Sequence, residues 1–164
     1  MKTLRNAQPG PIPYDTARAD EARVAFADLP KNLIDLVAGV SGCSPYLQGL
    51  LQREAVWLRK VLDIDLDDLL AQTLTANGES FATLSDDLRT AKRLVALLTA
   101  LADLGGLWAL EQVTDALTRL SDFAVEAALR HLVAAEIARG KLPGMGPEDA
   151  ATAAGMVALA MGKG

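Results

Sequence analysis

The sequence predicts an all-α protein: a bundle-like helical subdomain that ends in one short strand. Three observations support this fold class. Apolar residues recur at helical spacing from Thr16 to Arg139, alanine and leucine dominate the composition, and aromatic residues make up only 4%. That stretch contains no segment in which apolar and polar residues alternate, as they would in a half-buried strand. With 164 residues, the chain can enclose one apolar core.

The composition narrows the function classes. Hydrophobic residues make up 51% and charged residues 23%, which is typical of a soluble globular domain. The formal net charge of −5 argues against a nucleic-acid partner, which needs clustered lysine and arginine. The longest apolar run, Leu94 to Leu110, is interrupted by Asp103 and by Gly105-Gly106, so we expect no membrane span. A single cysteine, Cys43, fits a reducing cytoplasm.

The first elements follow from proline and glycine positions. Residues 1–15 contain three prolines and lack an apolar core, so we expect an irregular or disordered lead-in without a secretory signal. A helix is predicted over Thr16–Asp28, ending before Pro30. A second helical stretch covers Leu33–Val40, and Ser41-Gly42 should stop it.

Three short helices are predicted next. Ser44-Pro45 favours a helix start, because serine can accept a free backbone N–H and proline fits the first helical position. Ala55–Val61 forms a short helix or turn, and Leu66–Leu74 forms another that Asn77-Gly78 ends. The first turn of the latter is rich in carboxylates, which favour the positive end of the helix dipole: Asp63, Asp65, Asp67 and Asp68.

The clearest predicted helix runs from Ser85 to Leu104 and should be central. Gly105 should end it in the left-handed conformation. A helix over Leu110–Leu120 follows, then one that Ser121 caps and that runs through Ile137 until Gly140. The apolar face of the Ser85–Leu104 helix consists of Leu88, Ala91, Val95, Leu98 and Ala102, widened by Leu94, Leu97, Leu101 and Leu104.

The sequence changes character at residues 141–164. A loop rich in proline and glycine precedes a short apolar run, for which we expect a strand near Met156–Met161. Because a strand needs a partner, the remainder of its sheet is expected beyond residue 164. Gly162, Lys163 and Gly164 follow, and glycines after a strand allow backbone N–H groups to approach a phosphate. Since this change begins at residue 141, the predicted helical subdomain spans residues 16–140.

Few residues offer catalytic chemistry. His131 is the only histidine and is predicted to lie within a helix, where it is more often an ordinary surface or core residue than a catalytic base. Cys43 is interpreted as a small apolar residue. A complete small hydrolase is therefore excluded.

The aspartates from Asp63 to Asp68 imitate metal-binding patterns. An EF-hand loop would need glycine at Asp68 and glutamate at Leu74. Asp63 and Asp65 also imitate the metal-binding pair of nucleotidyltransferases, but they precede the glycine turn by about a hundred residues instead of following it. A carboxylate-rich helix start is the favoured interpretation, and we expect no metal site.

Several segments together resemble the glutamate–ammonia-ligase (glutamine synthetase) adenylyltransferase family. They are Ser41–Leu47, Leu88–Arg93, Leu101–Thr114, Ser121–Arg130 and Gly155–Gly164. The resemblance covers roughly residues 33–164. It implies that the last segment is the first strand and glycine turn of a nucleotidyltransferase domain cut short, with Gly162, Lys163 and Gly164 as its nucleotide- or phosphate-binding residues.

The resemblance implies a two-headed enzyme that removes AMP from glutamine synthetase by phosphorolysis and adds it from ATP, under a PII-type signalling protein. In the family, an Asp-x-Asp pair that binds Mg²⁺ should follow the glycine turn. The sequence extends only to Gly164, the last residue of that turn, and so does not reach the pair. The chain is therefore expected to be an inert N-terminal part, without catalytic residues, metal or nucleotide of its own. The alternative is a stand-alone helical interaction module. The DNA after codon 164 would separate the two.

Overall fold

The computed structural model describes residues 1–75 and 80–159, and every regular element among them is helical, which confirms the predicted class. In chain order the elements are η1 (Leu4–Asn6), α1 (Thr16–Ala25), α2 (Lys31–Cys43), α3 (Pro45–Arg53), α4 (Ala55–Val61), α5 (Leu66–Thr73), α6 (Phe81–Leu104), α7 (Leu110–Ala138) and η2 (Pro147–Gly155).

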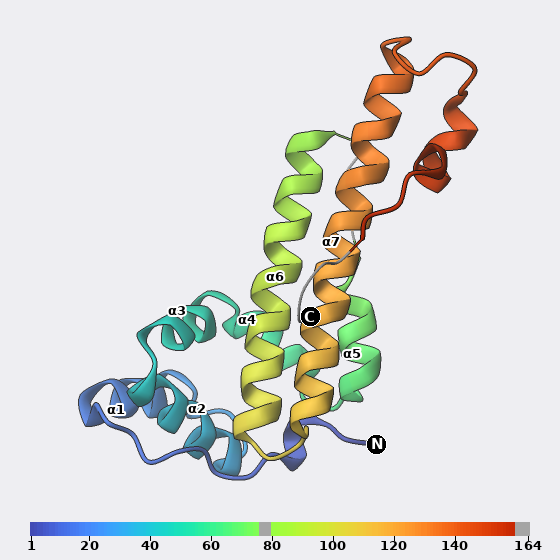
Figure 1. Cartoon of the computed structure of the whole chain (residues 1–164). Coiled ribbons are helices and arrows are strands. Elements are labelled where there is room, and N and C mark those ends of the chain that lie inside the picture. Colours follow the sequence, from blue (N-terminus) through green and yellow to red (C-terminus); the bar gives the residue numbers. More distant parts are fainter. Residues whose placement is uncertain (76–79, 160–164) are drawn as a thin grey trace.

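The molecule consists of a compact base and a projecting helical hairpin. The short helices α1 to α5 surround the later half of α6 and the start of α7, while the other halves of these two long helices extend beyond the base (Figure 1). Burial follows the same division. In the base, α6 buries Val95, Leu97, Leu98 and Leu101 against leucines of α2, α3 and α5. In the projecting half, only Leu84 and Ala91 of α6 are buried.

The start of α3 confirms the predicted helix start at Ser44-Pro45. The hydroxyl of Ser44 accepts the backbone N–H of Leu47 at 3.2 Å, and Pro45 occupies the first helical position. The helices α4 and α5 also occur where they were predicted. Arg59 joins α4 to the segment that follows α1. Its guanidinium pairs with Asp28 at 2.7 Å and lies 5.0 Å from the ring centre of Phe26.

The predicted stop at Ser41-Gly42 is wrong, because α2 continues through both residues to Cys43. The glycines of α2 instead allow another segment of the chain to approach the helix closely. A Cβ on Gly39 would lie 2.2 Å from the carbonyl oxygen of Pro11, and one on Gly42 would lie 2.4 Å from Cβ of Pro13. These glycines let the lead-in cross α2 at backbone contact.

The lead-in has a fixed course across the base. Leu4 is fully buried in the core. Backbone hydrogen bonds join Gln8 to Gly105 at 2.8 Å and Arg5 to Leu62 at 3.2 Å. The amide of Asn32 donates to the carbonyl of Ala7 at 2.8 Å. A prediction of disorder therefore does not hold for residues 1–15, although most of them lie outside regular helix.

Three predicted boundaries in the hairpin need correction. The helix predicted from Ser85 begins at Phe81, because Ser80 accepts the N–H of Thr83 and caps it four residues earlier. Gly106, with a φ of +67°, is the left-handed residue after α6, whereas Gly105 has a φ of −84°. Ser121 caps no helix, since α7 runs unbroken past it.

After α7, Gly140 takes a φ of +71° and the chain turns back. The 3-10 helix η2 packs against α7 (Figure 1). Residues 156–159 then run beside α7 without strand pairing. The predicted strand near Met156–Met161 is therefore absent over its first four residues, and its last two lie outside the described residues.

Candidate functional site

The predicted phosphate-binding residues Gly162, Lys163 and Gly164 lie outside the described residues, so their role stays a prediction. Within residues 1–75 and 80–159, no three His, Cys, Asp or Glu side chains lie close enough to hold a metal ion. In the same part of the chain, none of the helices combines the length and apolar character that crossing a membrane requires.

Asp63 and Asp65, which imitate metal-binding patterns, have structural partners instead. These partners confirm the interpretation of the segment as a carboxylate-rich helix start. Asp65 accepts the backbone N–H of Asp67 at 3.1 Å and of Lys2 at 2.9 Å. These bonds hold the pKa of its carboxyl below the ordinary value. Asp63 pairs with Arg5, whose hydrogen bond lowers the pKa of that carboxyl as well. The two side chains fasten the lead-in to the start of α5.

Neither His131 nor Cys43 belongs to a catalytic arrangement among the described residues. His131 is half-buried on α7, and its ring centre lies 6.1 Å from that of Phe81 at an interplanar angle of 45°. Cys43 is exposed, and its thiol donates to the carbonyl of Ile12 at 3.3 Å. Both therefore contribute to packing between segments.

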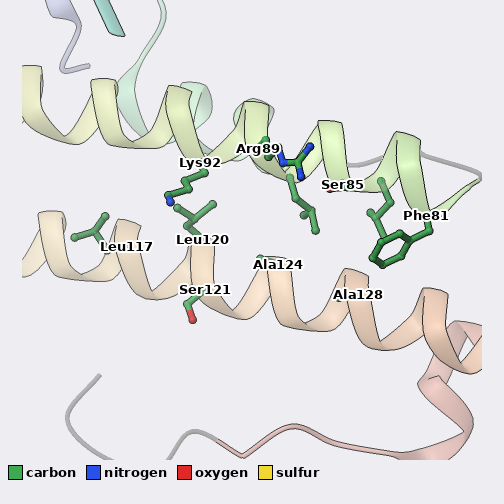
Figure 2. A pocket seen from close by; sticks show the side chains of 11 residues that line it. Phe81, Ser85, Arg89, Lys92, Leu117, Leu120, Ser121, Ala124 and Ala128 are labelled. Carbon is green, nitrogen blue, oxygen red and sulfur yellow. The ribbon is translucent and has the colours of Figure 1, made fainter. Parts of the chain in front are cut away.

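An apolar groove with a volume of about 470 Å³ lies between the projecting halves of α6 and α7. Figure 2 shows Leu117 and Leu120 projecting from α7 toward α6 and Phe81 projecting from α6 toward α7, whereas Ser121 projects away from α6. We call this groove the hairpin groove. Its lining residues are Phe81, Leu84, Ser85, Leu88, Arg89 and Lys92 of α6, and Leu117, Leu120, Ser121, Ala124 and Ala128 of α7.

The helical geometry explains the groove. Ser121, Ala124 and Ala128 recur at intervals of three and four residues, so one face of α7 carries only small side chains along these turns. Leu117 and Leu120, which precede them on α7, keep the wall apolar. Sequence reasoning missed this site because it ended one helix at Leu120 and began the other at Ser85. The pattern Phe81-Leu84-Leu88 and the Ser80 cap were the signals for the longer α6.

A second hollow lies on the adjacent face of α7. It has a volume of about 620 Å³ and is lined by α7, η2 and the segment from Met156 to Leu159. Ser121 borders both hollows. The last described residues of the chain therefore run along the helix whose next face forms the hairpin groove.

The sequence of this chain is similar to the sequences of known proteins. A sequence model of the family described as glutamate-ammonia ligase adenylyltransferase matches residues 34–164. A Caulobacter vibrioides protein named bifunctional glutamine synthetase adenylyltransferase/adenylyl-removing enzyme is 39% identical over 97% of this chain. Proteins of the same name from Bradyrhizobium diazoefficiens and Rhodopseudomonas palustris are 37% identical over 79% and 35% identical over 94%.

The match covers a small share of these relatives. The chain spans 17% of the Caulobacter protein, 14% of the Bradyrhizobium protein and 18% of the Rhodopseudomonas protein. No solved structure matches it. The family match nevertheless extends over most of the chain and includes α3, the hairpin and the segment after η2. The chain therefore belongs to the glutamate-ammonia ligase adenylyltransferase family.

Proposed function

We propose that this chain is the helical, non-catalytic N-terminal part of a cytoplasmic bifunctional enzyme that removes AMP from glutamine synthetase and adds it back. The observation that carries the proposal is the family match over most of the chain combined with its 14–18% share of the relatives' length. Its role is to support the catalytic domain that follows, with glutamine synthetase as the substrate and a PII-type protein as the regulator.

The reaction of the whole enzyme needs groups that the described residues do not supply. In the removing direction, a phosphate oxygen attacks the phosphorus of tyrosine-bound AMP. The bond from phosphorus to the tyrosine oxygen breaks, ADP is released, and the tyrosine oxygen takes up a proton. Mg²⁺ held by carboxylates supports such phosphoryl chemistry. Asp63 and Asp65 hold Arg5 and the start of α5 instead, so no step is assigned to them.

The finer placement of the C-terminal residues belongs to the same proposal. Residues from Met156 onward would become the first strand of a nucleotidyltransferase domain once the following sheet is present. Gly162, Lys163 and Gly164 would then approach the nucleotide phosphate through backbone N–H groups. The extended backbone of Met156, with φ −74° and ψ 142°, is compatible with this arrangement.

The experiment measures ADP release from adenylylated glutamine synthetase with phosphate, Mg²⁺ and uridylylated PII protein. The 164-residue chain should release none. A chain extended through the DNA that follows codon 164 should release ADP, and replacing the Asp-x-Asp pair of the extension with Asn should abolish it. ADP release by the short chain would refute the non-catalytic role. An extended chain that folds but stays inactive with every partner present would refute the proposed enzyme.

A further inference from the structure

The hairpin groove is an apolar surface without a partner among the described residues. Helix α7 has 29 residues, yet only Ala116 and Val133 are buried. Phe81 is 65% exposed at one end of the groove, and Leu117 is 46% exposed on the opposite wall. A partner that covered these exposed apolar side chains would remove them from water, which favours contact there.

The chemistry of the groove favours a helix as the occupant. The hydrogen-bonding side chains along its walls are the hydroxyls of Ser85 and Ser121 and the cationic ends of Arg89 and Lys92. An extended peptide would leave its backbone groups unpaired there, whereas a helix satisfies its own. The small side chains of Ala124 and Ala128 leave room for a helix to approach. From Phe81 to Lys92 the groove is about 16 Å long, which corresponds to roughly three turns of helix at 1.5 Å per residue.

The α6 rim of the groove is positively charged. Figure 2 shows Lys92 extending from α6 toward α7 beside Leu120. Lys92 makes no ion pair with any of the described residues, and Arg89 contacts Asp86 at 3.3 Å with both side chains more than 70% exposed. Such exposed pairs are weak. Carboxylates along one edge of an incoming helix would therefore meet at least one unpaired cation, and this complementarity sets its orientation.

The position of the chain's last described residues indicates where the helix comes from. Val157 and Leu159 are 78% and 83% exposed, and they lie along the hollow that shares Ser121 with the groove. A segment joined to the chain beyond residue 164 is tethered to this part of the molecule, and tethering raises its effective concentration at the groove. The relatives provide such polypeptide, since this chain spans only 17% of the Caulobacter protein.

We propose that the hairpin groove is the docking site for an amphipathic helix, with carboxylates along one edge, from the polypeptide that follows residue 164 in the full-length family protein. This inference rests on the proposed function. It adds the surface through which the helical part holds the rest of the enzyme.

The test compares thiol labelling of the short chain and the extended chain. Cys43 is first replaced (Cys43→Ser), and Ala124→Cys, at a position that lines the groove but not the second hollow, places one thiol on the groove wall. A maleimide should label it rapidly in the short chain, and about tenfold or more slowly in the extended chain, because the docked helix must open first. Ala17→Cys, exposed on α1 in the base, is the matched control and should label alike in both chains.

The charge claim has its own variants in the extended chain. Lys92→Glu should restore fast labelling at position 124, whereas Lys60→Glu, on α4 in the base, should leave it slow. Equal labelling of both chains would overturn docking, and slow labelling that Lys92→Glu leaves unchanged would overturn the carboxylate edge. Protection that rises with protein concentration would show a second copy in the groove and would also overturn the proposal.

The ADP-release assay separates this inference from the proposed function. An extended chain that is active but labels as fast as the short one disproves the docking helix and leaves the enzyme assignment standing. A photocrosslinker at Leu117 gives a second measurement, because the crosslinked peptide should come from the extension of the same molecule and contain Asp or Glu beside an apolar face. Crosslinks to glutamine synthetase or to a PII protein alone would overturn the inference.

Discussion

Single side chains start four of the helices. Asp15, Ser44, Asp65 and Ser80 each accept a backbone N–H from the first turn of the helix that follows, at distances from 3.0 to 3.2 Å. Without them these N–H groups would lack a partner within the helix. At this scale, short side chains with an oxygen acceptor decide where α1, α3, α5 and α6 begin.

Replacing Ser44 with alanine should lower the free energy of unfolding by about 1 kcal/mol, because the N–H of Leu47 loses its acceptor. Urea denaturation measures the change. The control is Ser121→Ala. Ser121 is exposed to solvent in the middle of α7, so this change should alter the free energy of unfolding by no more than about 0.5 kcal/mol. Equal midpoints for Ser44→Ala and the parent chain would show that this cap contributes nothing.

Asp65 should make stability depend on acidic pH. Hydrogen bonds from the backbone N–H groups of Asp67 and Lys2 lower its folded-state pKa below the unfolded value of about 3.9. The ionised carboxylate therefore stabilises the fold above that value, and its contribution is lost as pH falls through the folded pKa. Asp65→Asn should be less stable than the parent at pH 7, and the difference should shrink below about pH 4. A difference that stays constant across urea midpoints from pH 7 to pH 3 would contradict this.

At the scale of the element, α2 shows how a helix accepts a crossing segment. Its glycines Gly39 and Gly42 face Pro11 and Pro13 of the lead-in at backbone contact. By contrast, Gly49 in α3 has open space around the position of a Cβ. The same residue type therefore has opposite consequences in neighbouring helices.

Gly39→Ala should destabilise the protein, because the new methyl group would lie 2.2 Å from a backbone oxygen that cannot move without displacing the lead-in. Gly49→Ala should stabilise it by about 0.5–1 kcal/mol, since alanine favours helix. Thermal melts of the two variants should shift in opposite directions. A stabilising Gly39→Ala would mean that the lead-in does not cross α2 as described.

Two leucines in the later half of α6 differ in burial. Leu98 is fully buried in the base, whereas Leu104 at the end of the helix is 40% exposed. Leu98→Ala should cost about 2–5 kcal/mol through lost burial and the cavity it leaves. Leu104→Ala is the matched control and should cost clearly less. Equal unfolding midpoints for the two variants would show that the wrong face of α6 was assigned to the core.

At the scale of the whole molecule, the lead-in closes the base. It runs from the start of α5 past the turn between α6 and α7 and across α2, joined to each by hydrogen bonds or close contact. Its buried Leu4 belongs to the same core as Leu98. The hairpin beyond the base has no such cover, which leaves its groove open for a partner.

Deleting residues 1–8 should therefore lower the melting temperature markedly, since removing Leu4 alone should cost about 2–5 kcal/mol. Circular dichroism should still report a helical spectrum, because α6 and α7 do not depend on the lead-in for their backbone hydrogen bonds. A truncated chain that melts with the parent would show that residues 1–8 do not complete the core.

Much of the fold could be predicted because helical periodicity is a local property. Ser44, the α4 segment and the α5 carboxylates were read correctly from neighbouring residues. The errors lie where a distant segment decides. Gly42 resembles a helix stop until the lead-in is placed against it, and Ser121 resembles a cap until α7 is seen to continue. The hairpin groove was not predictable, since it needs α6 and α7 at their full length and side by side.

The sequence by itself determined the helical class, the family and the helix start at Ser44, because periodicity, short motifs and this cap depend on residues close together in the chain. The tertiary structure alone decided that Leu4 is core, that Gly39 and Gly42 are contact points, and that α6 and α7 leave an apolar groove open. Those properties depend on which segments meet in space. Burial and close approach arise between residues that the linear order separates, so local pattern cannot specify them.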